Sequence, residues 1–502
     1  MLHAKKNSIL AFTTFSDFWF VIMRKLSLKP AFVIVLAAVA IPARATTYFI
    51  APASAGGSDA NNGASVNTPW LTPNHSVTCG DVILAAPGSY SAVNFSYGTW
   101  GTVNCPAGNN VAWLICATFD ACKFTANGVF QAMAVTQSYW GVQGWEVTAL
   151  GDTDACFTAY PPSSTVQIHH IIFANNVANG CHNSGFTSGN SGNAGVDYMA
   201  IIGNIAYNAA QSTQFCASGI SIYQPVQSDS LPGTHIYIAG NFSYGNFDAN
   251  PCAGGAPTDG NGILIDTPDG SQSALPSPYA AQIVVDNNIL LSNGGRGLDV
   301  FNNSAGSSHA AIYARHNTAW GNNADPNETN NLCGELRIYV AVNVQELYNL
   351  AATNAPSGCS AHPLYAFYVA NGSSTDIINN NLGWTSTGTY TAISNSPGFS
   401  FGSNNQFGTN PGFANPTAPG APNCAGAASV LGCMAQVVAN FTPTAAAAIP
   451  FGYRVPSTKQ NYDPLFPQWL CNVNLPPGLV TMGCVAQSTM PAAVTITGVK
   501  VQ

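Results

Sequence analysis

Seven asparagines close short apolar runs in the middle of the chain, and their recurrence constrains the fold more than any other feature. They lie 28, 37, 47, 29, 32 and 32 residues apart. Each unit alternates apolar and polar residues, turns at the asparagine and continues with a second short apolar run, which is typical of strands. Repeats of this kind indicate a solenoid, because one repeat cannot bury its own apolar face. The asparagines are Asn176, Asn204, Asn241, Asn288, Asn317, Asn349 and Asn381.

The repeats predict an all-β protein that folds as a parallel β-helix with a continuous core of Ile, Val and Leu. Asn tolerates left-handed backbone and can bond its equivalent one coil away, so we expect an Asn ladder at one corner. The alternative is an Asn-rich β-sandwich with coincidental spacing. We expect the β-helix over 46–390, with its coils from about Val77 to Trp384. The Pro-, Gly- and Ala-rich segment 391–502 is expected to cap the open end of the last coil.

The first 45 residues are expected to be a signal region, with the true start at Met23. A basic head is followed by an apolar stretch from Ala31 to Ile41 and by a small-x-small cleavage site at Ala43-Arg44-Ala45. The apolar stretch is too short to span a bilayer, and no other segment qualifies. The sequence therefore predicts a secreted or periplasmic protein, monomeric and without a membrane span.

Removal of that segment leaves a strongly acidic chain. Six of the 13 basic residues lie in it, against one of the 21 acidic residues, so the remainder has a net charge of −13. No basic stripe is left to neutralise phosphates, which argues against nucleic acid as a partner.

All 14 cysteines follow residue 45, and an even number favours disulfides in an oxidising compartment. No tightly spaced pair of the zinc-binding kind occurs. The sequence predicts two local disulfides in the C-terminal segment, Cys424–Cys433 and Cys471–Cys484, and leaves the other pairings open.

Three stretches resemble a known family. The opening YFIAP and GGSDANNGASVNTPW is similar to the start of secreted polysaccharide lyases. The block from Asn288 to Asn323 resembles the central coils of the calcium-dependent, pectate-lyase-like polysaccharide lyase family nine, and Thr258 to Gly262 resembles its preceding coil. The resemblance implies a right-handed parallel β-helix that acts on acidic polysaccharide. One departure is chemical: Leu264 stands where that family has its catalytic lysine, and leucine cannot accept a proton.

Alternation along four successive strands identifies the side chains of a candidate groove. If Ile220, Ile263, Leu298 and Leu336 point inward, two outward stripes remain. One stripe contains Ser221, Leu264, Asp299 and Arg337, and the other contains Tyr223, Asp266, Phe301 and Tyr339. Aromatic faces with carboxylates and an arginine suit a sugar, although an ordinary external stack is the alternative. The predicted substrate-binding residues are Tyr223, Asp266, Phe301, Arg337 and Tyr339.

Acidic residues gather near these strands, and the predicted ligands of a Ca²⁺ ion are Asp248, Asp259 and Asp266. Acids that only decorate turns are an equal alternative. The candidate catalytic residues are Arg296 and Asp299. Arg296 is the best basic candidate in a lyase, although arginine more often clamps a carboxylate than removes a proton.

Three functions remain open from the sequence. The resemblance favours a calcium-dependent lyase that cleaves uronate polysaccharide by β-elimination. Asp266 and Asp299 on adjacent coils would suit an inverting glycoside hydrolase. A non-catalytic sugar-binding or surface solenoid would explain Leu264 without further assumption.

Overall fold

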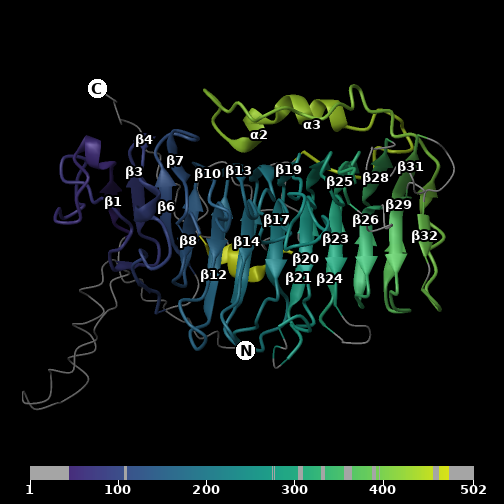
Figure 1. Ribbon diagram of the computed structural model, residues 1–502, viewed down its shortest axis with the longest axis horizontal. Helices are drawn as coiled ribbons and strands as arrows, with labels where there is room; N and C mark the ends of the chain where they lie inside the picture. Colours follow the sequence, from purple (N-terminus) through teal and green to yellow (C-terminus); the bar gives the residue numbers. More distant parts are fainter. Residues whose placement is uncertain are drawn as a thin grey trace, which may run out of the picture. The chain divides into compact units, whose positions relative to one another are not determined.

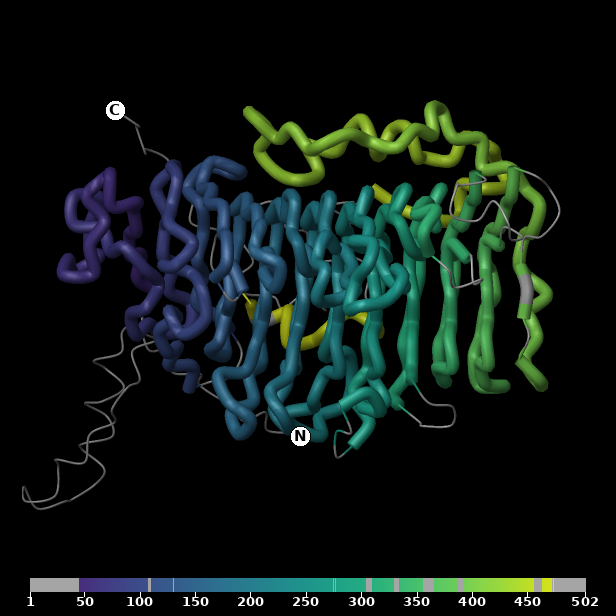
Figure 2. Tube along the Cα trace, in the orientation of Figure 1, coloured from purple at the N-terminus to yellow at the C-terminus, as the bar shows by residue number. Residues whose placement is uncertain are grey.

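The computed structural model describes residues 45–106, 110–129, 131–273, 275, 277–303, 309–328, 334–354, 365–386, 392–394, 396–455 and 463–473. The expected signal region and Cys484 lie outside these residues. The described chain forms coils that stack from β1 (Thr47–Ile50) to β33 (Gln406–Phe407). Figure 1 shows the strands of successive coils side by side, and Figure 2 shows the same coils as consecutive turns of one tube.

Three long sheets run the length of the stack, and every strand pair in them is parallel. Sheet 1 contains, in spatial order, β1, β3 (Val82–Ala85), β6 (Ala112–Cys116), β9 (Trp140–Gln143), β12 (Ile168–Ala174), β15 (Val196–Ile202), β18 (Thr234–Ala239), β21 (Gln282–Asp286), β24 (Ile312–Arg315), β27 (Val344–Leu347) and β30 (Ile377–Asn379).

Sheet 2 contains β4 (Gly88–Ser89), β7 (Cys122–Ala126), β10 (Trp145–Ala149), β13 (Val177–Cys181), β16 (Ile205–Ala209), β19 (Phe242–Tyr244), β22 (Ile289–Leu291), β25 (Thr318–Trp320), β28 (Leu350–Thr353), β31 (Leu382–Thr385) and β33. Sheet 3 contains β8 (Met133–Val135), β11 (Phe157–Ala159), β14 (Phe186–Ser188), β17 (Ile220–Tyr223), β20 (Ile263–Asp266), β23 (Leu298–Phe301), β26 (Gly334–Tyr339), β29 (Tyr365–Ala370) and β32 (Ala392–Ser394). A short pair, β2 (Val77–Thr78) with β5 (Val103–Asn104), flanks the first coils.

Each coil from β6 to β32 contributes one strand to each sheet, and sequence neighbours in a sheet are one coil apart. Strands that return to the same sheet in parallel do so by right-handed connections, because strand twist favours that hand. The protein is therefore a right-handed parallel β-helix, as predicted. The stack extends beyond the expected limits of Val77 and Trp384 at both ends, to β1 and β33.

The Asn ladder is confirmed at the turn from sheet 1 to sheet 2. Asn204 donates from its backbone N–H and from Nδ2 to Oδ1 of Asn241, at 2.9 and 3.0 Å, and Nδ2 also reaches the carbonyl of Phe173. The same pattern repeats from Asn176 to Asn381 and ends on Asn405. The residue before each ladder Asn, and not the Asn itself, has left-handed backbone; these residues are Asn175, Gly203, Gly240, Asn287, His316, Tyr348 and Asn380.

A second ladder, which the sequence analysis missed, follows sheet 2. Asn246 donates to Oδ1 of Asn293, and Asn293 donates to Oδ1 of Asn322. Glu335 occupies the next position and accepts from Nδ2 of Asn322 at 2.6 Å. Each of the three asparagines lies five residues after a member of the first ladder, so the signal was present in the sequence as a repeated Asn-x4-Asn pattern.

The described residues of the C-terminal segment form three parts. Phe399, Phe401 and Phe407 pack against the core at the end of the last coils, where a cap was expected. The part with α2 (Val430–Cys433) and α3 (Ala435–Phe441) instead lies along the outer face of sheet 2, as Figure 1 shows. Residues 463–473 pack on the outer face of sheet 1. The expectation of a segment that only covers the end is therefore wrong for these two parts.

The lateral packing has a clear physical cause. The outward residues of sheet 2 include large apolar side chains, which the apolar side chains of α2 and α3 bury. Trp320 contacts Phe441 with ring centroids 5.4 Å apart, and the backbone N–H of Val430 donates to Oδ1 of Asn175. On sheet 1, Arg315 forms an ion pair with Asp463, and Tyr237 contacts Phe466. The 3-10 helix η4 (Gln468–Asn472) lies in this second lateral part.

Five disulfides join described cysteines, and Cys424–Cys433 is among them, as predicted. Cys471 is also disulfide-bonded, and its pairing with Cys484 stays a prediction. The other four are Cys79–Cys105, Cys116–Cys122, Cys156–Cys181 and Cys216–Cys252. Among the described residues, no helix has the length and apolar character that a membrane crossing requires.

Candidate functional site

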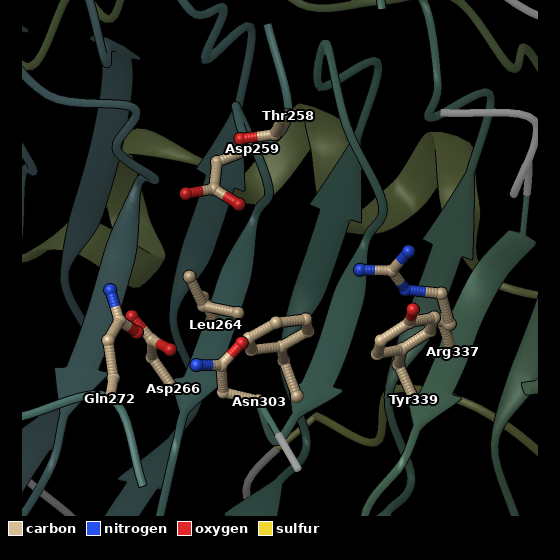
Figure 3. A pocket seen from close by; sticks show the side chains of 9 residues that line it. Thr258, Asp259, Leu264, Asp266, Gln272, Asn303, Arg337 and Tyr339 are labelled. Carbon is tan, nitrogen blue, oxygen red and sulfur yellow. The ribbon is translucent and has the colours of Figure 1, made fainter. Parts of the chain in front are cut away.

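The outer face of sheet 3 carries a pocket of about 350 Å³. The described C-terminal parts lie on sheets 1 and 2, so they leave this face open. The pocket lies over β20, β23 and β26 and beside the loops that precede and follow β20. Its lining residues, shown in Figure 3, are Thr258, Asp259, Leu264, Asp266, Gln272, Phe301, Asn303, Arg337 and Tyr339.

The strand register predicted from alternation is confirmed across this face. Ile220, Ile263, Leu298 and Leu336 are aligned on neighbouring strands and fully buried. The next positions align Ser221, Leu264, Asp299 and Arg337, and two positions further on lie Tyr223, Asp266, Phe301 and Tyr339. Inward stacking of identical apolar positions thus fixes which side chains face the pocket.

Four of the five predicted substrate-binding residues line the pocket: Asp266, Phe301, Arg337 and Tyr339. Tyr223 does not line it, although it is paired with Asp266 in the next coil. Its hydroxyl lies 3.0 Å from Oγ of Ser273, in the loop that also carries Gln272. Tyr223 therefore borders the pocket side of sheet 3 without being part of the pocket wall.

Aromatic rings form one side of the pocket. Phe301 and Tyr339 stack with ring centroids 5.3 Å apart and planes 9° from parallel. The guanidinium carbon of Arg337 lies 5.0 Å from the centroid of the Tyr339 ring, within the range of a cation–π contact. In Figure 3 Arg337 and Tyr339 stand together at one end of the pocket, and Asp259 and Asp266 lie toward the other. The pocket thus combines a flat apolar wall with charge of both signs.

Asp299, predicted to be catalytic, is fully buried and does not line the pocket. Its two carboxylate oxygens accept from Nε and Nη2 of Arg337. Burial alone would lower the pKa of Arg337, but the Asp299 carboxylate outweighs burial and holds that pKa above its usual value. Asp299 therefore fixes the position and the charge of Arg337, and does not itself face a ligand.

Arg296, the predicted proton acceptor, is also fully buried outside the pocket lining. Its Nη1 donates to the carbonyl of Thr258 at 2.9 Å and lies 2.5 Å from a carboxylate oxygen of Glu328. Burial, and then the charge of Arg337, lower the pKa of Arg296. The bond to the Thr258 carbonyl ties Arg296 to the turn that presents Asp259.

The three predicted calcium ligands do not converge. Asp248 is 7% exposed, lies outside the pocket lining, and accepts N–H groups from Ala217, Thr258 and Asp259. Burial, and then Asp259, raise its pKa to about 8. Asp248 is therefore a structural residue of the loop before β20. Among the described residues one cluster, Cys216, Asp248 and Cys252, has metal-like spacing, but its two cysteines are joined in a disulfide.

Asp259 and Asp266 remain as two acids in one pocket, and their environments differ. Burial, followed by the charge of Asp299, raises the pKa of Asp259 to about 6, while Arg296 and Arg337 oppose the shift. Burial, followed by the charge of Asp259, raises the pKa of Asp266 to about 8. At neutral pH Asp266 is therefore mostly protonated and Asp259 mostly ionised. Pairs of carboxylic acids whose environments give them different pKa values are typical of sites that perform acid–base chemistry.

Leu264, at the position of the family's lysine, lies between these acids in Figure 3. Leucine neither donates nor accepts a proton, so this position gives the pocket no acid–base group. Three lining residues, Thr258, Gln272 and Asn303, were not predicted from the sequence. Asn303 lies two residues after Phe301, so continued alternation would have identified it; Gln272 lies in a long loop that gives no such signal.

Comparisons with known proteins identify similar folds. No protein-family model matches the chain, and no curated protein matches it. Among solved structures, a pectate lyase aligns over 67% of this chain and 78% of its own, with 19% identity and a TM-score of 0.38. The A-module of a mannuronan C-5 epimerase from Azotobacter vinelandii aligns over 66% and 89%, with 12% identity and a TM-score of 0.35.

A GH136 lacto-N-biosidase from Eubacterium ramulus aligns over 73% of this chain and 68% of its own, with 10% identity and a TM-score of 0.37. Because these sequence identities and TM-scores are low, the function of this chain has to follow from the chemistry of its pocket.

Proposed function

We propose that the protein binds a polysaccharide in the sheet 3 pocket and hydrolyses a glycosidic bond there, with Asp266 as general acid and Asp259 as general base. The observation that carries this proposal is the presence of two acids in one pocket, with pKa values of about 8 and about 6. Asp299, the earlier candidate for the second acid, is engaged by Arg337.

The reaction uses both protonation states. Asp266 donates its proton to the glycosidic oxygen as the bond from that oxygen to the anomeric carbon breaks. Asp259 accepts a proton from the water molecule that attacks the same carbon. The products are a new reducing end and a free hydroxyl on the departing sugar. The Phe301–Tyr339 stack can hold the apolar face of a sugar ring during this step.

Arg337 supports an acidic substrate. Asp299 engages its Nε and Nη2, and no hydrogen bond joins Nη1 to a described residue, so we propose Nη1 as the nitrogen that meets a ligand. A uronate carboxylate beside this buried guanidinium would gain a charge-assisted hydrogen bond. The acidic chain would otherwise repel such a polymer, so Arg337 is the residue on which recognition depends.

A second candidate is a calcium-dependent lyase, and the oxygen-bearing side chains of Asp259, Asp266, Gln272 and Asn303 in the pocket favour it. These are hard ligands of the kind that Ca²⁺ prefers, so two of the three predicted ligands fit. Calcium bound there would neutralise a uronate carboxylate and acidify the adjacent C–H. We rank this candidate second because the described lining residues include no lysine or histidine to accept that proton.

The proposal includes a secreted or periplasmic location. Five disulfides among the described residues are typical of proteins that fold in an oxidising compartment. We propose a monomer as the acting unit, because the described lining residues lie on neighbouring coils of one chain and on the loops beside them.

The test is incubation of the protein with pectate, alginate, glycosaminoglycans and neutral glucans, with calcium or with a chelator. New reducing ends without an ultraviolet-absorbing unsaturated product support hydrolysis. We expect Asp259→Asn and Asp266→Asn each to lower the rate about 10²–10⁴-fold, while Asp152→Asn, a remote acid, leaves it unchanged. An unsaturated, calcium-dependent product would support the lyase instead. Binding without any product would leave a sugar-binding solenoid, and no binding would overturn the proposal.

A further inference from the structure

The second outward stripe of sheet 3 continues beyond the pocket. Tyr160 directly follows β11, and the pairing of Ala159 with Ser188 and of Ser188 with Ile222 aligns Tyr160 with Gly189 and Tyr223. The stripe then passes through Asp266 to the aromatic pair that lines the pocket. We call Tyr160, Tyr223, Phe301 and Tyr339 the aromatic row.

All four side chains of the aromatic row are partly exposed, whereas the residues before Tyr160 and Tyr223, Ala159 and Ile222, are fully buried. The row thus marks the boundary between the core and the open face. Neighbouring coils are about 4.8 Å apart, so Tyr160, Tyr223 and Phe301, each two coils from the next, lie at steps of about 10 Å. Aromatic rings at such regular steps present flat apolar faces along the axis of the stack.

Gly189 explains how Tyr160 lies in this row. A Cβ atom at position 189 would lie 2.6 Å from Cδ2 and 2.8 Å from Cε2 of Tyr160. The Tyr160 ring therefore lies across the coil that separates it from Tyr223, in space that any other residue would fill. Tyr97, which is 38% exposed, contacts this ring with centroids 6.0 Å apart and widens the apolar surface.

We propose that the aromatic row is a binding track for a polysaccharide chain that lies along the solenoid axis, with Tyr223 and Tyr160 as sugar-binding subsites beyond the pocket. The proposal rests on the proposed function for the polymer that occupies the pocket. The continuous stripe supports a polysaccharide as the ligand, because a sugar chain that stacks on Phe301 and Tyr339 reaches Tyr223 and then Tyr160 along the same line. Stacking on sugar C–H faces supplies the attraction.

The chemistry of the track differs from that of the pocket. Tyr160, Gly189 and Tyr223 carry no charge, whereas the pocket contains Arg337 and two acids. The track therefore contributes affinity that depends on the number of sugar residues, and the pocket supplies the preference for charge. A chain long enough to reach from Tyr339 to Tyr160 must cross six coils, which are five coil-to-coil steps.

The experiment compares disaccharides with octasaccharides prepared from pectate, alginate, hyaluronate and a neutral β-glucan, titrated against the full chain by calorimetry. We expect octasaccharides to bind more tightly than disaccharides of the same sugar. Tyr160→Ala should weaken octasaccharide binding about three- to ten-fold without changing disaccharide binding. Tyr160→Phe, which keeps the ring, should retain the wild-type value, and Tyr348→Ala, a 39% exposed tyrosine on another face, should have no effect.

Equal affinity for both lengths, or an unchanged octasaccharide affinity in Tyr160→Ala, would overturn the track while the pocket and its function stand. Weakening of both lengths by Tyr160→Ala would also overturn it, because the residue would then act on the pocket. Failure of every octasaccharide to bind the wild type would overturn the track together with the proposed function.

Discussion

Arg337 donates from Nε to Oδ1 of Asp299 at 2.8 Å and from Nη2 to Oδ2, between the paired strands β26 and β23. The two side chains are 4% and 0% exposed. The pair therefore places the Arg337 guanidinium in the pocket wall, where the buried Asp299 carboxylate balances its charge. Recognition of an acidic ligand and stability of the coil depend on the same two residues.

Removal of the acid in this pair should be costly. Asp299→Ala leaves a buried guanidinium without its counter-charge, and we expect a loss of about 3–5 kcal/mol in the free energy of unfolding. Urea denaturation followed by circular dichroism measures it, with Asp152→Ala, a partly exposed acid with a neutral partner, as the control. Asp299→Leu combined with Arg337→Met should recover much of the loss, because apolar pairs replace buried ion pairs well. If Asp299→Ala were as stable as the wild type, Asp299 would not be the counter-charge that stabilises Arg337.

The Asn ladder predicts a second stability effect. Asn288 accepts from Asn241 and donates to Asn317 and to the carbonyl of Ile238. Asn288→Leu leaves these buried groups without partners, and we expect a loss of about 1–3 kcal/mol. Thermal denaturation measures it. Asn67→Leu, at an exposed position, is the matched control, and an equal effect in both variants would argue against a special role for the ladder.

Glu346 predicts a pH-dependent effect. Its side chain is fully buried, neither carboxylate oxygen has a hydrogen-bond partner among the described residues, and burial raises its pKa to about 8. Because the folded-state pKa lies above the unfolded value, the folded state binds the proton more tightly. The stability that Glu346 contributes is complete below the unfolded pKa and is lost as the pH rises through about 8.

We therefore expect Glu346→Gln to match the wild type near pH 4 and to become progressively more stable than it up to about pH 8, by a few kcal/mol at most, since each pKa unit corresponds to about 1.4 kcal/mol. Chemical denaturation across that range tests the sign. A difference that stays constant with pH would show that Glu346 does not titrate on folding.

The C-terminal disulfides give a covalent test. Peptide mapping without reduction should recover Cys424–Cys433, and we still predict Cys471–Cys484. The Cys424→Ala, Cys433→Ala double variant should lose about 2–3 kcal/mol at most, because the closed loop is short. It should also make the α2–α3 segment more accessible to protease, since that segment packs on sheet 2 through side chains and few backbone bonds. Unchanged proteolysis would show that packing alone holds it.

The sequence by itself determined the β-helix, one of its two Asn ladders, the strand register of sheet 3 and one disulfide. These features follow from local patterns that repeat along the chain. The apolar residues of successive coils must stack in the core, and this stacking decides which face of the sheet the flanking side chains occupy. In sheet 3 the stacked residues are Ile220, Ile263, Leu298 and Leu336. Tertiary structure alone decided which outward residues reach a ligand. Asp299 was predicted on the outer face of sheet 3 and Arg296 at its edge. In the structure Arg337 bonds Asp299. Arg296 contacts Glu328 and the carbonyl of Thr258.

The same reason explains the errors over Asp248 and the C-terminal segment. Alternation assigns a side chain to a face, but burial on that face depends on loops and segments that arrive from distant parts of the chain. The backbone N–H groups of Thr258 and Asp259 donate to the carboxylate of Asp248, which is therefore engaged within its own loop. Described parts of the C-terminal segment pack on sheets 1 and 2 because the outer faces of these sheets carry apolar side chains. The described parts of that segment cover the outer faces of sheets 1 and 2, so they leave open the face of sheet 3 that carries the pocket.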